Sequence, residues 1–329
     1  MMRTVLRLAL LTTARINEAI LTGAALSDEV EVVGVASRDP ARAEVYARER
    51  GLQRWWPRYD DLLGEEDVDA VYVALPNALH VEWSIRALEA GKHVLCEKPL
   101  GRDPDAVARA FATAERSGRL LMEGFMYRHH PQIKRVRELL DEGAIGELRL
   151  VRAQFDSTLD RLEDVRWVRE LGGGALLDVG CYCVDALRLL AGEPLRVFGE
   201  STSTPDGVDR RFAATLRFGE GVLGTFDCAL DVEPRQVLEA IGSEGSILVR
   251  RPFTAELEGV EVRRGGELEP VAVESADRYR LQLDNFARAV AGEEPPLLSG
   301  AASIAQARVL DALLRSAESE GPVALVEGA

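Results

Sequence analysis

Cysteine, lysine and long hydrophobic runs are scarce in this chain of 329 residues. Its four cysteines are too few for a disulfide framework, and the spacing of Cys181 and Cys183 does not match the C-x-x-C pattern of redox or zinc sites. We therefore expect reduced, buried thiols in a cytoplasmic protein and no metal site. No stretch of about 18 apolar residues occurs, so no transmembrane helix is predicted.

Positive charge is also in deficit, because the formal net charge is −15. A strongly acidic chain has no electrostatic reason to bind nucleic acid or an anionic membrane surface, and we expect neither partner. Arginine supplies nearly all of the basic residues. The three lysines are Lys92, Lys98 and Lys134, and each is worth inspecting because lysine is the exception here.

Residues 1–124 alternate between strand-like and helix-like segments, which predicts an α/β domain with a doubly wound parallel sheet. Such a Rossmann-type sheet binds dinucleotides at the carboxyl ends of its strands. The predicted strands are Val5–Leu11, Val30–Ala36, Val68–Leu75, His93–Cys96 and Leu120–Glu123, and the predicted helices are Ile16–Ala25, Pro40–Arg50, Val81–Ala90 and Asp103–Ser117.

Residues 125–329 have a different rhythm, with several strands in succession separated by glycine-containing turns. We predict a second, α+β domain with a large, open and mostly antiparallel sheet. Its predicted strands are Glu147–Asp156, Arg196–Ser203, Arg211–Phe218, Val222–Leu230, Gln236–Gly242 and Ser246–Arg250, and its predicted helices are Ile133–Glu142, Leu176–Leu190, Leu281–Ala291 and Ala302–Glu318.

The turn between the first strand and the first helix, Ala9–Ile16, contains no glycine. A dinucleotide site normally has glycines there, because they let the backbone approach the pyrophosphate. Ala14 can replace the glycine that permits close packing, and Thr12 can offer a hydroxyl and an N–H to a phosphate. An ordinary turn without a ligand is the alternative.

Ser37 and Arg38 follow the second predicted strand, about where a Rossmann domain selects its cofactor. An acidic residue there binds the ribose of NAD, whereas an arginine accommodates the 2′-phosphate of NADP. Arg38 therefore favours NADP(H) over NAD(H). The alternative is a solvated surface arginine, one of many in this chain.

Two further segments carry chemistry. Glu97-Lys98-Pro99 follows a strand, so Lys98 would stand at the mouth of the cleft, where it could bind a substrate oxygen and move a proton. Asp178 and Tyr182 follow a glycine triplet and are four residues apart, which places a carboxylate and a phenol on one face of a helix. The alternatives are a surface lysine, a solvent-facing aspartate and a core tyrosine.

Together these segments resemble the Gfo/Idh/MocA oxidoreductase family, and their order and spacing match across most of the chain. The motifs most resemble the branch of NADP-dependent aldose (xylose-type) dehydrogenases and trans-dihydrodiol dehydrogenases. The glycine-free first turn is the main departure. The matching stretches are Thr13–Asn17, Val35–Ala43, Val68–His80, Ala90–Leu100, Leu120–Gln132 and Gly172–Tyr182.

The resemblance implies hydride transfer between a nicotinamide and a carbinol or carbonyl carbon of a sugar or polyol. It implies that Lys98 and Tyr182 handle the proton, that Asp178 assists them, and that the second sheet joins subunits into a homodimer or homotetramer. The cofactor-binding residues would be Thr12, Thr13, Ala14, Arg15, Ile16, Ser37, Arg38, Leu75, Pro76, Asn77, His80, Glu97 and Lys98, and the substrate-binding residues would be Lys98, Tyr127, Trp167, Asp178 and Tyr182.

Two other functions remain compatible with the sequence. The glycine-free first turn is also compatible with a regulator that senses a nicotinamide cofactor without catalysis. An enzyme could alternatively keep its nicotinamide bound and use it in a closed redox cycle.

Overall fold

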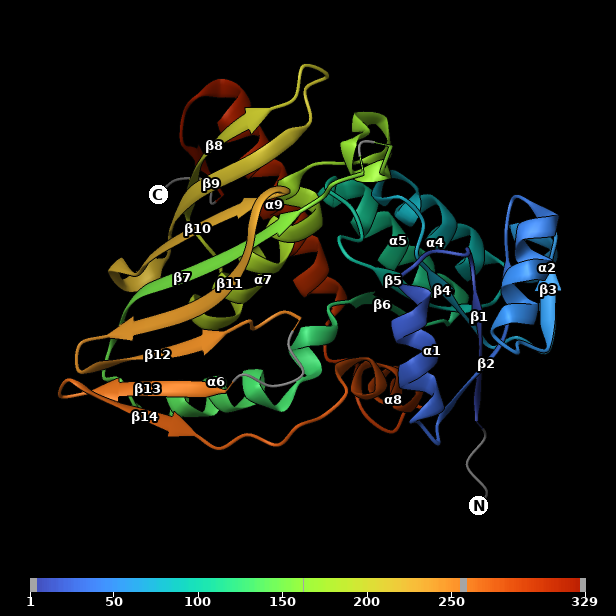
Figure 1. The fold of residues 1–329 in the computed structure, drawn as a ribbon, viewed down its shortest axis with the longest axis horizontal. Coiled ribbons are helices and arrows are strands. Elements are labelled where there is room, and N and C mark those ends of the chain that lie inside the picture. Colours follow the sequence, from blue (N-terminus) through green and yellow to red (C-terminus); the bar gives the residue numbers. More distant parts are fainter. Residues whose placement is uncertain (1–4, 162, 255–258, 326–329) are drawn as a thin grey trace. The chain divides into compact units, whose positions relative to one another are not determined.

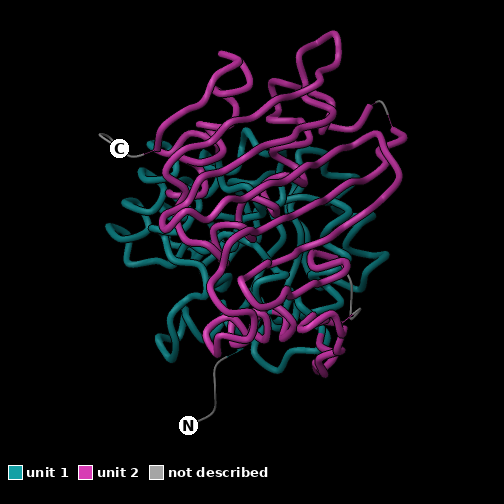
Figure 2. Tube along the Cα trace, turned by 90° about the vertical axis from the view of Figure 1, so that its left-hand side faces the viewer, with its two compact units in different colours: residues 1–101, 105–129, 277–304 teal, residues 102–104, 130–276, 305–329 magenta. Residues whose placement is uncertain are grey.

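The computed structural model describes residues 5–161, 163–254 and 259–325. The chain forms two compact units, which are described separately (Figure 2). Unit 1 comprises residues 1–101, 105–129 and 277–304, and unit 2 comprises residues 102–104, 130–276 and 305–329. Of the helices in the described ranges, none is long and apolar enough to cross a membrane.

Unit 1 is built on a six-stranded parallel sheet in the order β3-β2-β1-β4-β5-β6 (Figure 1). This is the strand order of a Rossmann fold, in which the connections change direction between β1 and β4. Crevices for ligands open at the carboxyl ends of the strands beside that point. The strands are β1 Leu6–Leu10, β2 Val30–Ala36, β3 Arg54–Trp56, β4 Ala70–Val73, β5 His93–Glu97 and β6 Leu121–Gly124.

Helices alternate with the strands of unit 1 along the chain, and its central strands are mainly apolar, as in a parallel sheet with both faces covered. All four residues of β4 are buried, as are Leu8 and Leu10 of β1. The helices are α1 Asn17–Ala25, α2 Pro40–Glu49, α3 Tyr59–Leu63, α4 His80–Glu89, α5 Pro104–Ser117 and α8 Arg278–Val290, and short 3-10 turns lie at Asn77–Leu79 and Met126–His129.

Helix α8 belongs to unit 1, although it follows the second sheet in the sequence. It packs closely on α1, where a Cβ at Gly23 would lie 2.7 Å from the backbone nitrogen of Arg280. Ser27 Oγ donates to Asp284 at 2.5 Å, and Glu29 pairs with Arg288 at 3.4 Å. The predicted domains divide the chain between residues 124 and 125. The compact units differ from this division, because α8, although late in the sequence, packs within unit 1.

Unit 2 contains a nine-stranded sheet in the order β14-β13-β12-β11-β7-β10-β9-β8-β15. Among the strands that the structure describes in this sheet, β7 and β10 are the only parallel pair, and the other neighbouring strands pair antiparallel. The predicted mostly antiparallel sheet is confirmed. Its strands are β7 Leu148–Thr158, β8 Arg196–Ser203, β9 Asp209–Arg217, β10 Leu223–Ala229, β11 Asp231–Gly242, β12 Gly245–Arg250, β13 Val260–Arg264, β14 Glu267–Val271 and β15 Val323–Ala324.

One face of this sheet is buried and the other is exposed. In β9, Phe212, Ala214 and Leu216 are buried, whereas the residues between them are exposed. This alternation with a period of two is the pattern of a half-covered antiparallel sheet. The helices of unit 2 are α6 Pro131–Asp141, α7 Cys181–Ala191 and most of α9 Gly300–Ser319, and short turns lie at Val165–Trp167, Arg169–Leu171 and Gly219–Gly221.

Two kinds of difference separate the predicted elements from the observed ones. The short elements β3, α3, β13, β14 and β15 were not predicted, because segments of two to five residues show too little periodicity. The predicted helix Leu176–Leu190 was wrong in part, since its first five residues, Leu176–Gly180, form a π-helical turn before α7 begins.

Candidate functional site

The turn between β1 and α1 is held together by Asn17. The fully buried side chain of Asn17 donates from Nδ2 to the carbonyl oxygen of Thr12 at 2.6 Å. Ile16 occupies the cap position of α1, and no side chain in the described part of the chain caps this N-terminus. A helix N-terminus without a side-chain cap can receive an anionic group. Asn17 was missed in the sequence because its signal is a single polar residue inside a helix.

Three neighbouring residues after β2, Ser37 to Asp39, have different environments. Ser37 is buried, and its Oγ accepts from the backbone N–H of Asp39 at 3.2 Å. Asp39 caps α2 by accepting from the N–H of Arg42 at 3.2 Å. Arg38 is exposed and makes no ion pair with any residue that the structure describes. The carboxylate is thus engaged locally, whereas the guanidinium can reach a ligand.

His80 joins the loops that follow β4 and β5. Its ring nitrogens lie 2.7 Å from the carbonyl oxygen of Leu75 and 2.8 Å from that of Pro99. The side chain is only 1% exposed, and burial lowers its pKa. His80 therefore positions these loops rather than presenting its ring to a ligand. Pro76 and Asn77, which begin the next turn, are partly exposed.

Glu97 and Lys98 stand at the carboxyl end of β5. The hydroxyl of the buried Tyr72 on β4 donates to Glu97 Oε1 at 2.5 Å. Lys98 is partly exposed, and its peptide bond to Pro99 is cis. The backbone N–H of Leu100 donates to Glu123 Oε1 at 2.8 Å. The lysine is thus anchored on both sides by contacts with strands β4 and β6.

Helix α8 adds Tyr279 and Gln282, neither of which carries a recognisable signal in the sequence. Burial, and next the charge of Glu97, raise the pKa of Tyr279 to about 12. Gln282 is fully buried, and neither polar atom of its side chain has a partner among the residues described here. A Cβ at Gly124 would lie 3.5 Å from Glu97 Oε1 and 3.6 Å from Gln282 Oε1. These groups surround the end of β6.

Tyr127, in contrast, lies inside unit 1. Its side chain is fully buried, and its ring meets that of Phe125 edge-on with 6.3 Å between centroids. This environment gives it a packing role within the unit.

In unit 2, the glycine triplet Gly172–Gly174 wraps around the loop that carries Arg166. The N–H of Gly174 donates to the carbonyl oxygen of Arg166 at 3.0 Å, and that of Gly173 donates to Val168 at the same distance. A Cβ at Gly173 would lie 2.4 Å from the carbonyl oxygen of Arg166. The triplet is therefore required for this close approach.

Asp178 and Tyr182 follow this triplet in the sequence and lie in two different kinds of helix. Asp178 lies in the π-helical turn, and its Oδ2 is 3.3 Å from Nε of Arg166. Tyr182 lies in the first turn of α7 and is 5% exposed. π-Helical turns are often found at functional sites. Here the wider turn alters the angle between the two side chains from that expected for an α-helix.

An aromatic cluster surrounds Tyr182. Its ring lies 5.4 Å from that of Phe155 and 5.5 Å from that of Phe253, and these two phenylalanines stack at 5.3 Å. Phe253 was not singled out in the sequence, because it comes from a connecting segment with no pattern. Trp167, nearby in the sequence to Arg166, has a buried indole N–H without a partner among the described residues.

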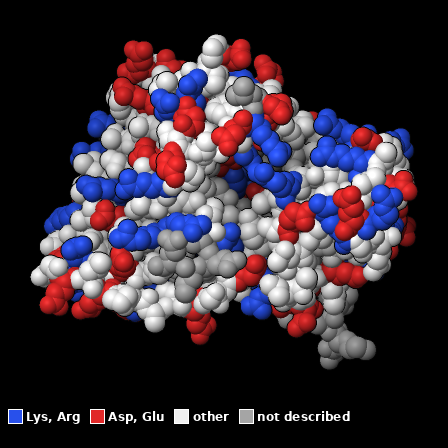
Figure 3. All heavy atoms as spheres, in the orientation of Figure 1, with Lys and Arg blue, Asp and Glu red and all other residues white. Residues whose placement is uncertain are grey.

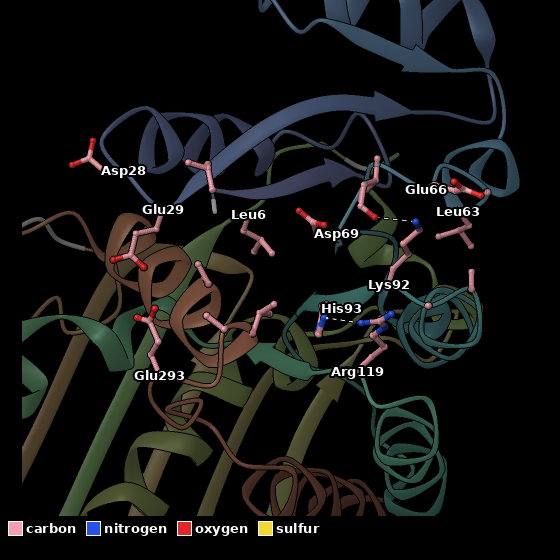
Figure 4. A pocket seen from close by; sticks show the side chains of 18 residues that line it. Leu6, Asp28, Glu29, Leu63, Glu66, Asp69, Lys92, His93, Arg119 and Glu293 are labelled. Atoms are coloured by element: carbon pink, nitrogen blue, oxygen red, sulfur yellow. Dashed lines mark hydrogen bonds between the residues drawn. The ribbon is translucent and has the colours of Figure 1, made fainter. Parts of the chain in front are cut away.

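A separate cavity of about 940 Å³ lies in unit 1 (Figure 4). Lys92, His93 and Arg119 lie on one side of it, and Asp28, Glu29 and Glu293 on another. It opens at the amino ends of β1, β4 and β5, the sheet edge opposite to Lys98. Lys92 is structural, because its Nζ donates to the carbonyl oxygens of Glu65 and Val68. This cavity is therefore not where a Rossmann sheet binds its dinucleotide.

The surface carries both positively and negatively charged side chains. On the face drawn in Figure 3, basic side chains alternate with acidic ones. Within the described ranges, no group of three or more His, Cys, Asp or Glu side chains is arranged to hold a metal ion.

Comparison with protein families matches both halves of the chain. Residues 13–125 match the model of the oxidoreductase family with an NAD-binding Rossmann fold, and residues 133–248 match the GFO/IDH/MocA C-terminal domain. The chain belongs to the GFO/IDH/MocA oxidoreductase family. The resemblance seen in the motifs and the predicted fold class are thereby confirmed, and the protein is an enzyme of the NAD(P)-dependent sugar oxidoreductase kind.

Members of the GFO/IDH/MocA family with known names resemble the whole chain. A D-xylose 1-dehydrogenase (NADP(+)) from Haloferax volcanii is 36% identical over 322 residues, which cover 96% of this chain and 98% of the relative. The solved structure of KijD10, a 3-ketoreductase from Actinomadura kijaniata in complex with NADP and TDP-benzene, is 34% identical with a TM-score of 0.90, covering 95% and 98% of the two chains. An aldose-aldose oxidoreductase from Caulobacter crescentus is 26% identical with a TM-score of 0.90, covering 98% and 100%.

Proposed function

We propose that this protein transfers a hydride between NADP(H) and a carbinol or carbonyl carbon of a sugar or related polyol, with Lys98 and Tyr182 handling the proton. One observation carries the assignment. Solved variants of KijD10 change a lysine to alanine or glutamate and a tyrosine to phenylalanine, and that tyrosine follows that lysine at the interval at which Tyr182 follows Lys98.

In this proposal, Lys98 donates a hydrogen bond to the reacting oxygen of the substrate, and Tyr182 gives or takes its proton. The aromatic rings around Tyr182 exclude water from the phenol. Asp178, paired with Arg166, helps to hold the substrate and the proton-transferring groups. The indole N–H of Trp167 can bind a sugar hydroxyl because the described residues give it no partner. Nicotinamide supplies or accepts the hydride when it is bound.

The chain's own residues fit a dinucleotide in unit 1. The uncapped start of α1, reached through Thr12–Ile16, would receive the pyrophosphate. Glu97, fixed by Tyr72, would bind the nicotinamide ribose, and the unpartnered amide of Gln282 offers both a donor and an acceptor close to it. Leu75, Pro76 and Asn77 would line the same edge, while Glu97 and Lys98 meet the cofactor from β5.

The preference for NADP(H) rests on Arg38. Its exposed guanidinium, with no ion pair in the part of the chain that the structure describes, suits a phosphate dianion, and Asp39 is occupied as a helix cap. Names of relatives agree, since the Haloferax xylose dehydrogenase is an NADP(+) enzyme and KijD10 was solved with NADP. Ser37 would support Arg38 by shaping the turn.

We further infer that the exposed face of the nine-stranded sheet joins copies of this chain into a homodimer or homotetramer. The exposed face carries Leu223, which is 45% exposed, and the resemblance to the family implies that this sheet joins subunits. Analytical ultracentrifugation of the purified protein measures its oligomeric state. A dimer or tetramer would support the inference, and a monomer would contradict it.

A second candidate function is a closed redox cycle on two sugars with a retained nicotinamide. The structural similarity to an enzyme named an aldose-aldose oxidoreductase favours it. A cofactor-sensing regulator without catalysis is less well supported, because Lys98, Asp178 and Tyr182 together serve no purpose in a sensor.

The test is a pair of titrations followed by a substrate screen. NADPH and NADH are titrated against the protein, with quenching of Trp55, Trp56, Trp83 and Trp167 fluorescence or calorimetry as the signal. Tight binding of NADPH, weak binding of NADH and turnover of an aldose, a 3-keto sugar or a dihydrodiol support the proposal. If neither cofactor binds, the supernatant of the denatured protein is examined for nicotinamide absorbance. Such absorbance would support the closed redox cycle, and its absence would contradict the proposal.

A further inference from the structure

Asp209, the first residue of β9, lies against the start of the helical segment that carries Asp178 and Tyr182. Its Oδ2 accepts from the backbone N–H of Leu176 at 2.7 Å, and the residue is only 9% exposed. The N–H of Ala175 also acts on this carboxylate. Two consecutive backbone amides at the beginning of the π-helical turn therefore point at one buried carboxylate.

We propose that Asp209 is a positioning residue for the reaction, which anchors the Gly174–Gly180 turn and thereby sets the direction of Asp178 and Tyr182. This inference rests on the proposed function, since it assigns Asp209 a role in that same site. Asp209 itself is not proposed to touch the substrate.

Gly174 shows that the carboxylate and the turn fit each other tightly. A Cβ at Gly174 would lie 1.9 Å from Asp209 Oδ1, which no side chain can tolerate, and the φ of this residue is +121°. The third glycine of the triplet thus makes room for the carboxylate. The contact is specific to this position, because a Cβ at Gly173 would instead meet the carbonyl oxygen of Arg166.

The anchor is placed where it can affect the functional side chains. The backbone N–H of Asp178 donates to the carbonyl oxygen of Gly174 at 3.0 Å, so Asp178 is hydrogen-bonded directly to the residue that Asp209 contacts. The π-helical turn runs without a break into α7, which begins one residue before Tyr182. A shift at Leu176 would therefore move both side chains.

A carboxylate is suited to this role, because an ionised oxygen accepts stronger hydrogen bonds from backbone amides than a neutral one. Burial raises the pKa of Asp209 to about 6, although the amides of Leu176 and Ala175 oppose this effect. The Cys228 thiol on β10 interacts electrostatically with Asp209, and burial raises the pKa of that thiol too. Asp209 is therefore ionised at neutral pH and becomes neutral in mild acid.

The experiment compares the wild-type protein with Asp209→Asn and with Asp206→Asn, a matched control in the exposed turn before β9. Hydrogen exchange of the peptide covering residues 172–182 is measured by mass spectrometry, and kcat and KM are measured between pH 5 and 8 with the sugar found in the screen. Far-UV circular dichroism reports global folding. Asp209→Glu, which keeps the charge, serves if Asp209→Asn does not fold.

We expect Asp209→Asn to speed exchange in this peptide about tenfold or more, as for the loss of a hydrogen bond to a charged group. We also expect Asp209→Asn to lower kcat and to leave the KM for NADPH unchanged. In the wild type, kcat should fall as the pH drops below about 6 and Asp209 becomes neutral, and this fall should be absent from the variant. Exchange equal to that of the wild type overturns the anchor, and altered exchange with unchanged kcat overturns its role in positioning. A wild type that turns over no sugar refutes the proposed function instead, while the exchange rates still decide whether Asp209 anchors the turn.

Discussion

The hydroxyl of Tyr72 donates a hydrogen bond of 2.5 Å to Glu97 across two neighbouring parallel strands. Tyr72 is fully buried, so the bond forms away from competing water. It fixes the last residue of β5 directly before Lys98. The acidic residue expected to meet the nicotinamide ribose is thus oriented from inside the sheet.

Tyr72→Phe removes this bond and leaves the ring in place. We expect a loss of about 1 kcal/mol in the free energy of unfolding and weaker binding of NADPH, because Glu97 loses its orientation. Urea denaturation and the NADPH titration measure the two effects. Tyr59→Phe is the control, since Tyr59 is also buried and packs edge-on against Trp83 at 4.8 Å. Equal NADPH affinity in the wild type and Tyr72→Phe would contradict this role.

Lys98→Ala and Tyr182→Phe should each lower kcat by a factor of about 10² or more, the usual contribution of a positioned proton-transferring group. The dissociation constant for NADPH should change little, because neither group is needed to bind the adenine half of the cofactor. Lys134→Ala is the control, since Lys134 is 80% exposed on α6. Full turnover in both variants would remove the assigned roles.

Arg38→Ala should weaken NADPH binding about tenfold or more and leave NADH binding nearly unchanged, because only NADPH carries the 2′-phosphate. The same titration with Arg48→Ala provides the control, since Arg48 is an exposed arginine at the other end of α2. An equal loss for both cofactors would show that Arg38 does not distinguish them.

Gly174→Ala should destabilise the protein by about 3 kcal/mol, because the new methyl group meets the Asp209 carboxylate in a backbone conformation that alanine rarely adopts. Gly143→Ala serves as a control for a positive φ without a steric clash. Gly143 also has a positive φ, of 71°, but a Cβ there would meet no atom within 4 Å. We expect about 1 kcal/mol for this control, measured by urea denaturation. Equal losses would show that space at Gly174 is not limiting.

Asp209 should make stability depend on pH between about 4 and 6. Its pKa in the folded protein, about 6, is above the value of 3.8 for an unperturbed aspartate. The folded state therefore binds the proton more tightly, so this stabilisation is fully present below pH 3.8 and is lost as the pH rises through 6. By linkage the difference between pH 4 and pH 7 is about 2 kcal/mol, because an unfolded aspartate is already partly ionised at pH 4.

The comparison of wild-type and Asp209→Asn denaturation curves isolates this contribution from that of the other carboxylates. The wild type should lose more stability than the variant between pH 4 and pH 7, whereas Asp206→Asn should follow the wild type. Parallel curves for all three proteins would show that Asp209 titrates normally.

The sequence alone determined the fold of both sheets and the position of the chemical motifs. The valine-rich, mainly apolar segments Val30–Ala36 and Val68–Leu75 indicate strands covered on both faces, and the alternation in residues 209–217 indicates a half-exposed sheet. Local turn chemistry placed Lys98 at a strand end, since the residue before a proline favours an extended backbone. These are properties of neighbouring residues, which a sequence displays directly.

Only the tertiary structure decided which residues surround those motifs. Tyr72 and Glu97 are 25 residues apart, Asp209 and Leu176 are 33 apart, and Gln282 reaches the end of β6 from a helix near the other end of the chain. It also decided that His80 joins two loops and that Asp178 lies in a π-helical turn. Such contacts depend on strand order and helix packing, which bring together residues whose separation along the chain carries no periodic signal.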